Sequence, residues 1–203
     1  MTRSVTREYV PSTALIVVDM QHDFVDPSGS LYVRGGQDIV APITQEIRAA
    51  RAAGATVVFT QDWHPARTPH FVTDGGIWPV HCVMGTPGAK LVPGLDPDGE
   101  PDPVVRKGSG PEDGYSGFSV RDLTTDRTKG TELSAILDEN GVMDAVIVGL
   151  AGDYCVKETA IDGVRLGFAM TVPLTLTRFV ELATGDAEQA VLAMREAGVE
   201  VIG

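Results

Sequence analysis

Five side chains that can do acid–base, nucleophilic or metal chemistry stand shortly after apolar runs of this 203-residue chain: Asp19, Asp62, His64, Lys107 and Cys155. Ligands of open α/β sheets bind beyond the carboxyl ends of the strands, so residues in this position are the first candidates for a site. A single polar residue after a strand is usually a turn former or a helix cap. Several at one rim of a sheet predict a reaction centre.

Cys155 is the candidate nucleophile. It follows the sequence AVIVGLAGDY, in which a buried-strand pattern breaks at Ala151 and Gly152 and a helix pattern begins. A helix N-terminus has unsatisfied N–H groups and roughly half a positive charge, which favours a thiolate and can hold an oxyanion. Asp19 within hydrogen-bond reach would take the thiol proton and pass it to a leaving amine, and Lys107 would balance the charges.

Asp62 and His64 are candidate metal ligands, because side chains at positions i and i+2 of an extended segment project from the same side. His70 and His81 follow in the same long stretch, so three of the four histidines of the chain lie close together in sequence. One aspartate with two or three histidines suits Zn²⁺, Fe²⁺ or Mn²⁺.

Two further residues, Cys82 and His22, are not assigned to the candidate site. Cys82 lies next to His81 and could be a further ligand, but such a cysteine is more often a small buried apolar residue. His22 has no such company and is interpreted as a loop histidine. A thioredoxin-like redox role is excluded, because the sequence contains no C-x-x-C.

These residues need a scaffold that brings strand ends together. Six apolar, β-branched runs are typical of parallel strands buried on both faces. They lie at 14–18, 55–59, 103–105, 145–149, 168–172 and 199–202. Helical patterns lie at 38–54 and about 131–140, and two more begin near 155 and at 186. In the last, the spacing of Asp186 and Gln189 fits a capping box.

The alternation predicts one domain over residues 1–203, of α/β class, with a doubly wound, mostly parallel six-stranded sheet and helices on both faces. Two stretches break the rhythm, residues 63–102 and 107–128. Loops this long are usually functional or disordered, and the Trp, His, Cys and Tyr residues in these two favour ordered walls of a site.

The composition favours a globular protein of the cytoplasm. Hydrophobic residues make up 43% and charged residues 22% of the chain. The formal net charge of −12 argues against a nucleic-acid partner, which requires clustered Lys and Arg. No membrane partner or secretion signal is expected, because no long apolar span or apolar N-terminal segment occurs. The chain has two cysteines in no disulfide pattern, which indicates free thiols in a reducing compartment.

The sequence resembles the isochorismatase-like cysteine hydrolases, and among them the nicotinamidases, over nearly the whole chain. The resemblance rests on VVDMQHDF (17–24), QDWHP (61–65), WPVHCVMGTPGA (78–89), RKG (106–108), YSGF (115–118) and GLAGDYCV (149–156). It implies a catalytic triad of Asp19, Lys107 and Cys155.

The resemblance also implies a single divalent metal ion, with zinc, iron and manganese left open. Its ligands would be Asp62, His64 and His81, whereas His70 matches a ligand that only some members use.

Substrate and oxyanion sites follow from the same resemblance. Phe24, Trp78 and Tyr115 match positions that line the ring pocket, although plain packing would also explain them. The backbone N–H groups of Ala151 and Cys155 would form the oxyanion hole, with a cis peptide bond before Ala151.

One departure from the family pattern lies in the loop before the nucleophile. The family segment commonly reads Ala-Thr-Asp, whereas this chain has Ala151-Gly152-Asp153. The effect of Gly152 on the oxyanion hole is left open.

The implied reaction converts nicotinamide to nicotinate and ammonia through a thioester on Cys155, with the pyridine nitrogen held at the metal. One alternative is a related hydrolase acting on another small amide or on isochorismate; isochorismate cleavage needs neither metal nor nucleophilic thiol. A second is a non-catalytic member of the fold. Assembly into a homo-oligomer is left open.

Overall fold

The computed structural model describes residues 8–95, 102–110, 112–122 and 125–203. The segment 1–7, on which part of the secretion-signal argument rests, lies outside the described residues. So do residues 96–101 of the first long stretch and residues 111, 123 and 124 of the second.

A six-stranded sheet forms the centre of the fold, in the order β3-β2-β1-β7-β8-β9, with every neighbouring pair parallel. The strands are β1 (Thr13–Val18), β2 (Thr56–Asp62), β3 (Val104–Lys107), β7 (Asp144–Gly149), β8 (Ala169–Pro173) and β9 (Glu200–Ile202). The predicted parallel α/β sheet is therefore confirmed. The chain adds strands outward on one side of β1 and then crosses to the other, so the switch point lies between β1 and β7.

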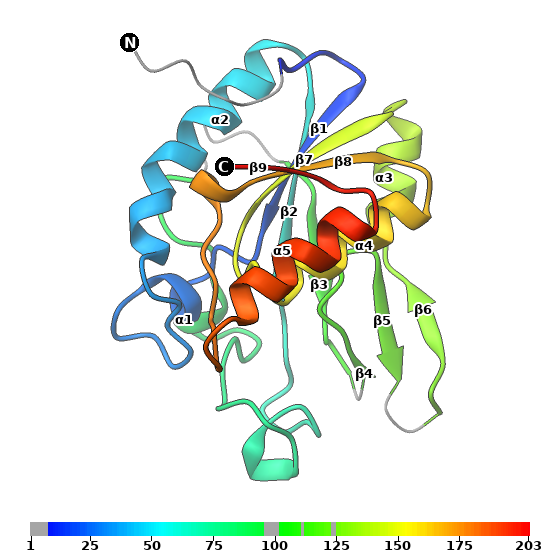
Figure 1. Cartoon of the computed structure of the whole chain (residues 1–203). Coiled ribbons are helices and arrows are strands. Elements are labelled where there is room, and N and C mark those ends of the chain that lie inside the picture. The colour runs from blue at the N-terminus through cyan, green and yellow to red at the C-terminus, as the bar shows by residue number, and fades with distance from the viewer. Residues whose placement is uncertain (1–7, 96–101, 111, 123–124) are drawn as a thin grey trace.

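Helices cover both faces of this sheet (Figure 1). They are α1 (His22–Val25), α2 (Val40–Ala52), α3 (Leu133–Glu139), α4 (Cys155–Arg165) and α5 (Asp186–Glu196). Alternate residues of β1 point to opposite faces: Leu15 belongs to the core under α1 and α2, whereas Ile16 belongs to the core under α3, α4 and α5. Burial on both faces explains the continuous apolarity of the strands.

A second, three-stranded antiparallel sheet stands beside the main one, and the sequence patterns did not predict it. It consists of β4 (Glu112–Asp113), β5 (Ser119–Asp122) and β6 (Thr128–Gly130). These strands are short, and β6 is exposed along its length. They therefore lack the apolar runs that identified the main strands.

The stretch after β2 is ordered mainly by short 3₁₀ helices and isolated bridges. The described residues include four 3₁₀ helices: η1 (Gly36–Ile39), η2 (Val72–Asp74), η3 (Pro87–Ala89) and η4 (Leu174–Leu176). Isolated bridges join His64 to Val83 and Phe71 to Trp78. Two histidine-bearing segments are thereby brought side by side.

The expected capping box of the last helix is wrong. Gly185 is the N-cap residue of α5, and the Asp186 carboxylate instead accepts a hydrogen bond from the Ala183 N–H at 2.8 Å. The side chain thus caps the preceding turn. Within the described part of the chain, no helix is long and apolar enough to cross a membrane.

Candidate active site

Asp19, Asp62, Lys107 and Cys155 meet at the carboxyl edge of the main sheet. Asp62 and Lys107 are the last residues of β2 and β3 and are register partners. Asp19 follows β1 with a left-handed backbone, at φ 49°. Cys155 is the first residue of α4, beyond the end of β7. The strand ends thus place all four residues around the topological switch point.

Lys107 lies at the centre of a buried ion network. Its Nζ atom is 2.8 Å from Asp19 Oδ2, forms a second ion pair with Asp62 Oδ1, and is 3.4 Å from Cys155 Sγ. Only 1% of Lys107 is exposed. A lysine this deeply buried is stable as a cation because two carboxylates surround it.

Burial and this lysine set the protonation states of the site. Burial by itself would lower the pKa of Lys107, but Asp19 and Asp62 raise it well above its ordinary value. Burial raises the pKa of the Cys155 thiol well above its ordinary range and raises the pKa of Asp19 as well, in both cases against the effect of Lys107. Cys155 is therefore a thiol that needs a base, and Asp19 is a carboxylate with increased basicity.

Thr60 holds Asp19 in place, a contact that the sequence analysis missed. The Thr60 hydroxyl donates a hydrogen bond to Asp19 Oδ1 at 2.6 Å and accepts one from the Asp19 N–H at 3.2 Å. Its place two residues before Asp62 on β2 puts both side chains on the same face of the strand, and that spacing was the available signal.

Gln21 is a second missed residue, and it fixes the backbone of Asp62. Its side-chain amide donates to the Asp62 carbonyl oxygen at 2.7 Å and accepts from the Asp62 N–H at 2.8 Å. Gln21 is fully buried. The two hydrogen bonds hold the end of β2 against the chain that follows β1.

Three histidines converge beside this network. One ring nitrogen each of His64, His70 and His81 lies within 4.8 Å of those of the others. The His64 and His81 Nε2 atoms are each 3.7 Å from Asp62 Oδ2. Lys107 and these two histidines hold the pKa of Asp62 well below its ordinary value, although burial alone would raise it.

The chemistry of this group fits a divalent metal ion. His64 is almost fully buried, yet neither of its ring nitrogens has a hydrogen-bond partner among the described residues. Buried polar atoms are seldom left unpaired, and imidazole nitrogens with a carboxylate are ordinary ligands of zinc and similar metals. Cys82 is buried in the apolar core and belongs to neither of the described groups that could hold a metal.

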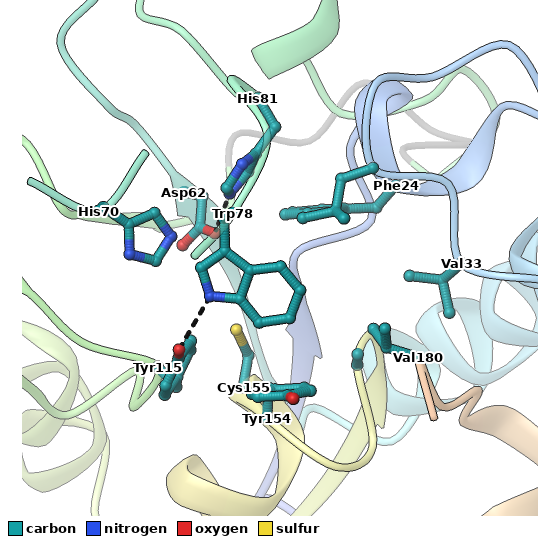
Figure 2. A pocket seen from close by; sticks show the side chains of 12 residues that line it. Phe24, Val33, Asp62, His70, Trp78, His81, Tyr115, Tyr154, Cys155 and Val180 are labelled. Carbon is teal, nitrogen blue, oxygen red and sulfur yellow. Dashed lines mark hydrogen bonds and ion pairs between the residues drawn. The ribbon is translucent and has the colours of Figure 1, made fainter. Parts of the chain in front are cut away.

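An aromatic pocket opens above Cys155 (Figure 2). Phe24, Trp78 and Tyr115 line it, as the family resemblance implied, and the Trp78 Nε1–H donates to the Tyr115 hydroxyl at 3.0 Å. Four further lining residues were not predicted from the sequence: Leu31, Val33, Tyr154 and Val180. Tyr154 packs edge-on against Trp78 with ring centroids 4.9 Å apart. Aromatic and aliphatic side chains thus form most of the pocket around Cys155.

The loop before Cys155 supplies two candidate oxyanion donors. The peptide bond between Leu150 and Ala151 is cis, as the family resemblance implied. Ala151 and Cys155 both line the pocket. Neither of their N–H groups donates a hydrogen bond to a described residue. Both are thus free to bind an oxygen atom of a ligand.

A buried thiol with an aspartate base and a lysine, at the switch point of a parallel sheet, defines a cysteine hydrolase of α/β class. The Isochorismatase domain family matches residues 13–203, and the chain belongs to this family.

Similar proteins of this family include enzymes named for amide hydrolysis. A nicotinamidase/pyrazinamidase of Mycobacterium tuberculosis is 40% identical over 192 residues, covering 93% of this chain and 97% of the relative. The pyrazinamidase of Pyrococcus horikoshii, solved in complex with zinc, is 37% identical with a TM-score of 0.82, covering 95% and 99%. PnC1 of L. infantum, solved in complex with nicotinate, is 33% identical with a TM-score of 0.85, covering 98% and 96%.

Proposed function

We propose that the protein is a nicotinamidase, an amidohydrolase that converts nicotinamide and water to nicotinate and ammonia. The observation that carries the proposal is that Cys155, joined to Asp19 through Lys107, lines an aromatic pocket that His70 and His81 also line. The similar proteins named for nicotinamide and pyrazinamide hydrolysis, and the relative bound to nicotinate, support the same substrate.

The first half of the reaction forms a thioester. Asp19 takes the proton of the Cys155 thiol, and Sγ attacks the carboxamide carbon. The carbonyl electron pair moves onto oxygen, which accepts hydrogen bonds from the Ala151 and Cys155 N–H groups; each such donor is worth about 2.7–4 kcal/mol. The C–N bond then breaks, Asp19 gives its proton to the nitrogen, and ammonia leaves.

The second half releases the acid. Asp19 takes a proton from a water molecule, whose oxygen attacks the thioester carbon. The C–S bond breaks, the proton returns from Asp19 to Cys155 Sγ, and nicotinate leaves. Lys107 stays a cation throughout and keeps the site near neutrality as the charge moves between Asp19 and Cys155.

Asp62, His64 and His81 would hold the divalent metal ion, and His70 lies close enough to join them. When bound, the metal supplies a Lewis acid for the ring nitrogen of the substrate. Zinc, iron and manganese all suit this donor set. The zinc-bound relative supports the same kind of site.

The compartment belongs to the same proposal. Cys155 is a free thiol and must stay reduced to act as a nucleophile, which favours the cytoplasm. There the reaction would return nicotinamide to the salvage of NAD.

Replacing His64 by alanine is expected to remove the metal and to raise the KM for nicotinamide by more than about tenfold. The variant loses a ligand whose ring nitrogens form no hydrogen bond with the described residues. Metal content by elemental analysis and steady-state kinetics measure the two effects. His22→Ala is the matched control, because His22 pairs with Asp26 at 2.6 Å, away from the group, and should keep both properties. A fully metal-loaded His64→Ala variant would show that the ligand set is wrong.

The activity is expected to fall on acidification at a pH above the ordinary pKa of an aspartate. Asp19 must be ionised to take the thiol proton, and its pKa is raised by burial. Since the pKa of Cys155 is also raised, the thiol stays available for this transfer into the alkaline range. A profile of kcat/KM against pH, with metal content checked at each pH, tests this. An acid limb at or below the ordinary aspartate value of about 3.9 would contradict it.

A comparison of nicotinamide with benzamide tests the substrate assignment. The two amides differ only in the ring nitrogen. We expect this nitrogen to lie at the metal ion that the histidine group would hold. We expect a higher kcat/KM for nicotinamide by at least about 100-fold, because a polar site loses its partner when benzamide binds. Equal rates would assign the thiol chemistry to a broader amidase. If another small amide were hydrolysed faster than both, the protein would instead be a related hydrolase of the family with that amide as its substrate.

A further inference from the structure

Gly152, in the loop that carries the nucleophile, has no space for a side chain. A Cβ atom built there would lie 2.5 Å from Cε1 and 2.7 Å from Cδ1 of the Phe179 ring. Gly152 is not among the described residues with a positive φ, so backbone conformation does not require glycine. A larger residue at position 152 would not fit, because the Phe179 ring occupies the position that its Cβ atom would take.

Phe179 belongs to the segment 177–181, which lies along the nucleophile loop. The Gly152 N–H donates a hydrogen bond to the Arg178 carbonyl oxygen at 2.7 Å. Gly149, the last residue of β7, forms an isolated parallel bridge with Thr177. These two backbone contacts, at the residues just before Phe179, thus hold its segment against Gly152.

Asp153 ties the same two pieces of chain together. Its carboxylate oxygens accept hydrogen bonds from the Val180 N–H at 3.0 Å and from the Glu181 N–H at 2.8 Å. Asp153 is only 4% exposed, so water competes little with these bonds. Val180 in turn lines the pocket near Tyr154 (Figure 2). The segment therefore joins the nucleophile loop to one wall of the pocket.

We propose that Phe179 is a positioning residue for the hydrolysis: its ring, seated on Gly152, fixes the loop whose Ala151 and Cys155 N–H groups receive the oxyanion. The inference rests on the proposed function. Phe179 is not among the residues found to line the pocket, so it acts through Gly152. Oxyanion donors work only when preorganised, and a misplacement of about 1 Å costs about 100-fold in rate.

Two substitutions and their combination test this contact. Gly152→Ala forces a methyl group against the ring and should lower kcat by about 100-fold with little change in KM or metal content. Phe179→Ala removes the support and should lower kcat by about tenfold. In the double variant the new methyl group has room, so kcat should equal that of Phe179→Ala alone and not the product of both losses.

An aldehyde probe separates positioning from general damage. Asp19 takes the proton of Cys155, Sγ adds to the aldehyde carbon of nicotinaldehyde, and the carbonyl electron pair moves to oxygen, which becomes an oxyanion. The adduct needs the oxyanion donors, whereas nicotinate binds without forming it. We expect the affinity for nicotinaldehyde to fall in parallel with kcat across the variants, with the affinity for nicotinate unchanged.

Gly130→Ala is the matched control, because a Cβ there has no atom closer than 4.0 Å, and it should keep the wild-type rate. If Gly152→Ala does not fold, Phe179→Ala decides. Wild-type kcat and aldehyde affinity in Phe179→Ala would overturn the inference, and so would equal losses for aldehyde and nicotinate. A wild-type protein without nicotinamide turnover would instead refute the proposed function, and the inference would fall with it.

Discussion

Replacing Cys155 by alanine will lower ammonia release from nicotinamide by at least about 10⁴-fold while metal content stays unchanged. Among the described residues that line the pocket, Cys155 is the thiol placed to form the covalent intermediate, and Lys107 lies between it and Asp19. The histidine group to which we assign the metal, His64, His70 and His81, does not include Cys155. Steady-state kinetics and elemental analysis of the purified variant measure both outcomes.

Cys82→Ala is the control for this experiment, because Cys82 is the second free cysteine and lies in the apolar core. It should keep most of the wild-type kcat. Loss of stoichiometric metal from Cys155→Ala would refute the separation of nucleophile from ligands. Substantial remaining turnover would refute the nucleophile assignment.

Replacing Lys107 by methionine will abolish activity and lower the free energy of unfolding by about 3–5 kcal/mol. The substitution leaves Asp19 and Asp62 buried without the cation that pairs with both. One or both carboxylates must then take up a proton or draw in water. Asp19 would lose its function as a base, and Asp62 would lose the charge that the histidine group faces. Urea unfolding followed by circular dichroism measures the stability.

Lys90→Met is the matched control, because Lys90 is exposed and forms none of the ion pairs found among the described residues. Its unfolding free energy should lie within about 0.5 kcal/mol of the wild type. A Lys107→Met variant as stable as the wild type would mean that the buried carboxylates do not depend on this cation. Retained activity would remove Lys107 from the catalytic group.

The main sheet could be predicted from the sequence because strands buried on both faces must be apolar along their length. The runs that became β1 and β7 are almost unbroken. The strand-end rule then identified Asp19 and Lys107, since parallel strands bring their carboxyl ends to one rim. The antiparallel sheet escaped prediction because its strands, β6 above all, are short and largely exposed.

The contacts that shape the site could be predicted less well, because most of them join residues far apart in sequence. Thr60 on β2 contacts Asp19 at the end of the neighbouring strand β1. Phe179 fills the space beside Gly152. Neither residue type predicts such a partner by itself. The departure at Gly152 was visible in the sequence, but only the structure shows that a ring occupies the space of its side chain.

Ammonia release from nicotinamide by the purified protein supplied with zinc, iron or manganese tests the central claim most directly. We expect steady turnover that yields one nicotinate for each ammonia. Absence of ammonia from protein with a reactive Cys155 thiol and a full metal site would contradict it, and would assign the cysteine hydrolase chemistry to a different small amide.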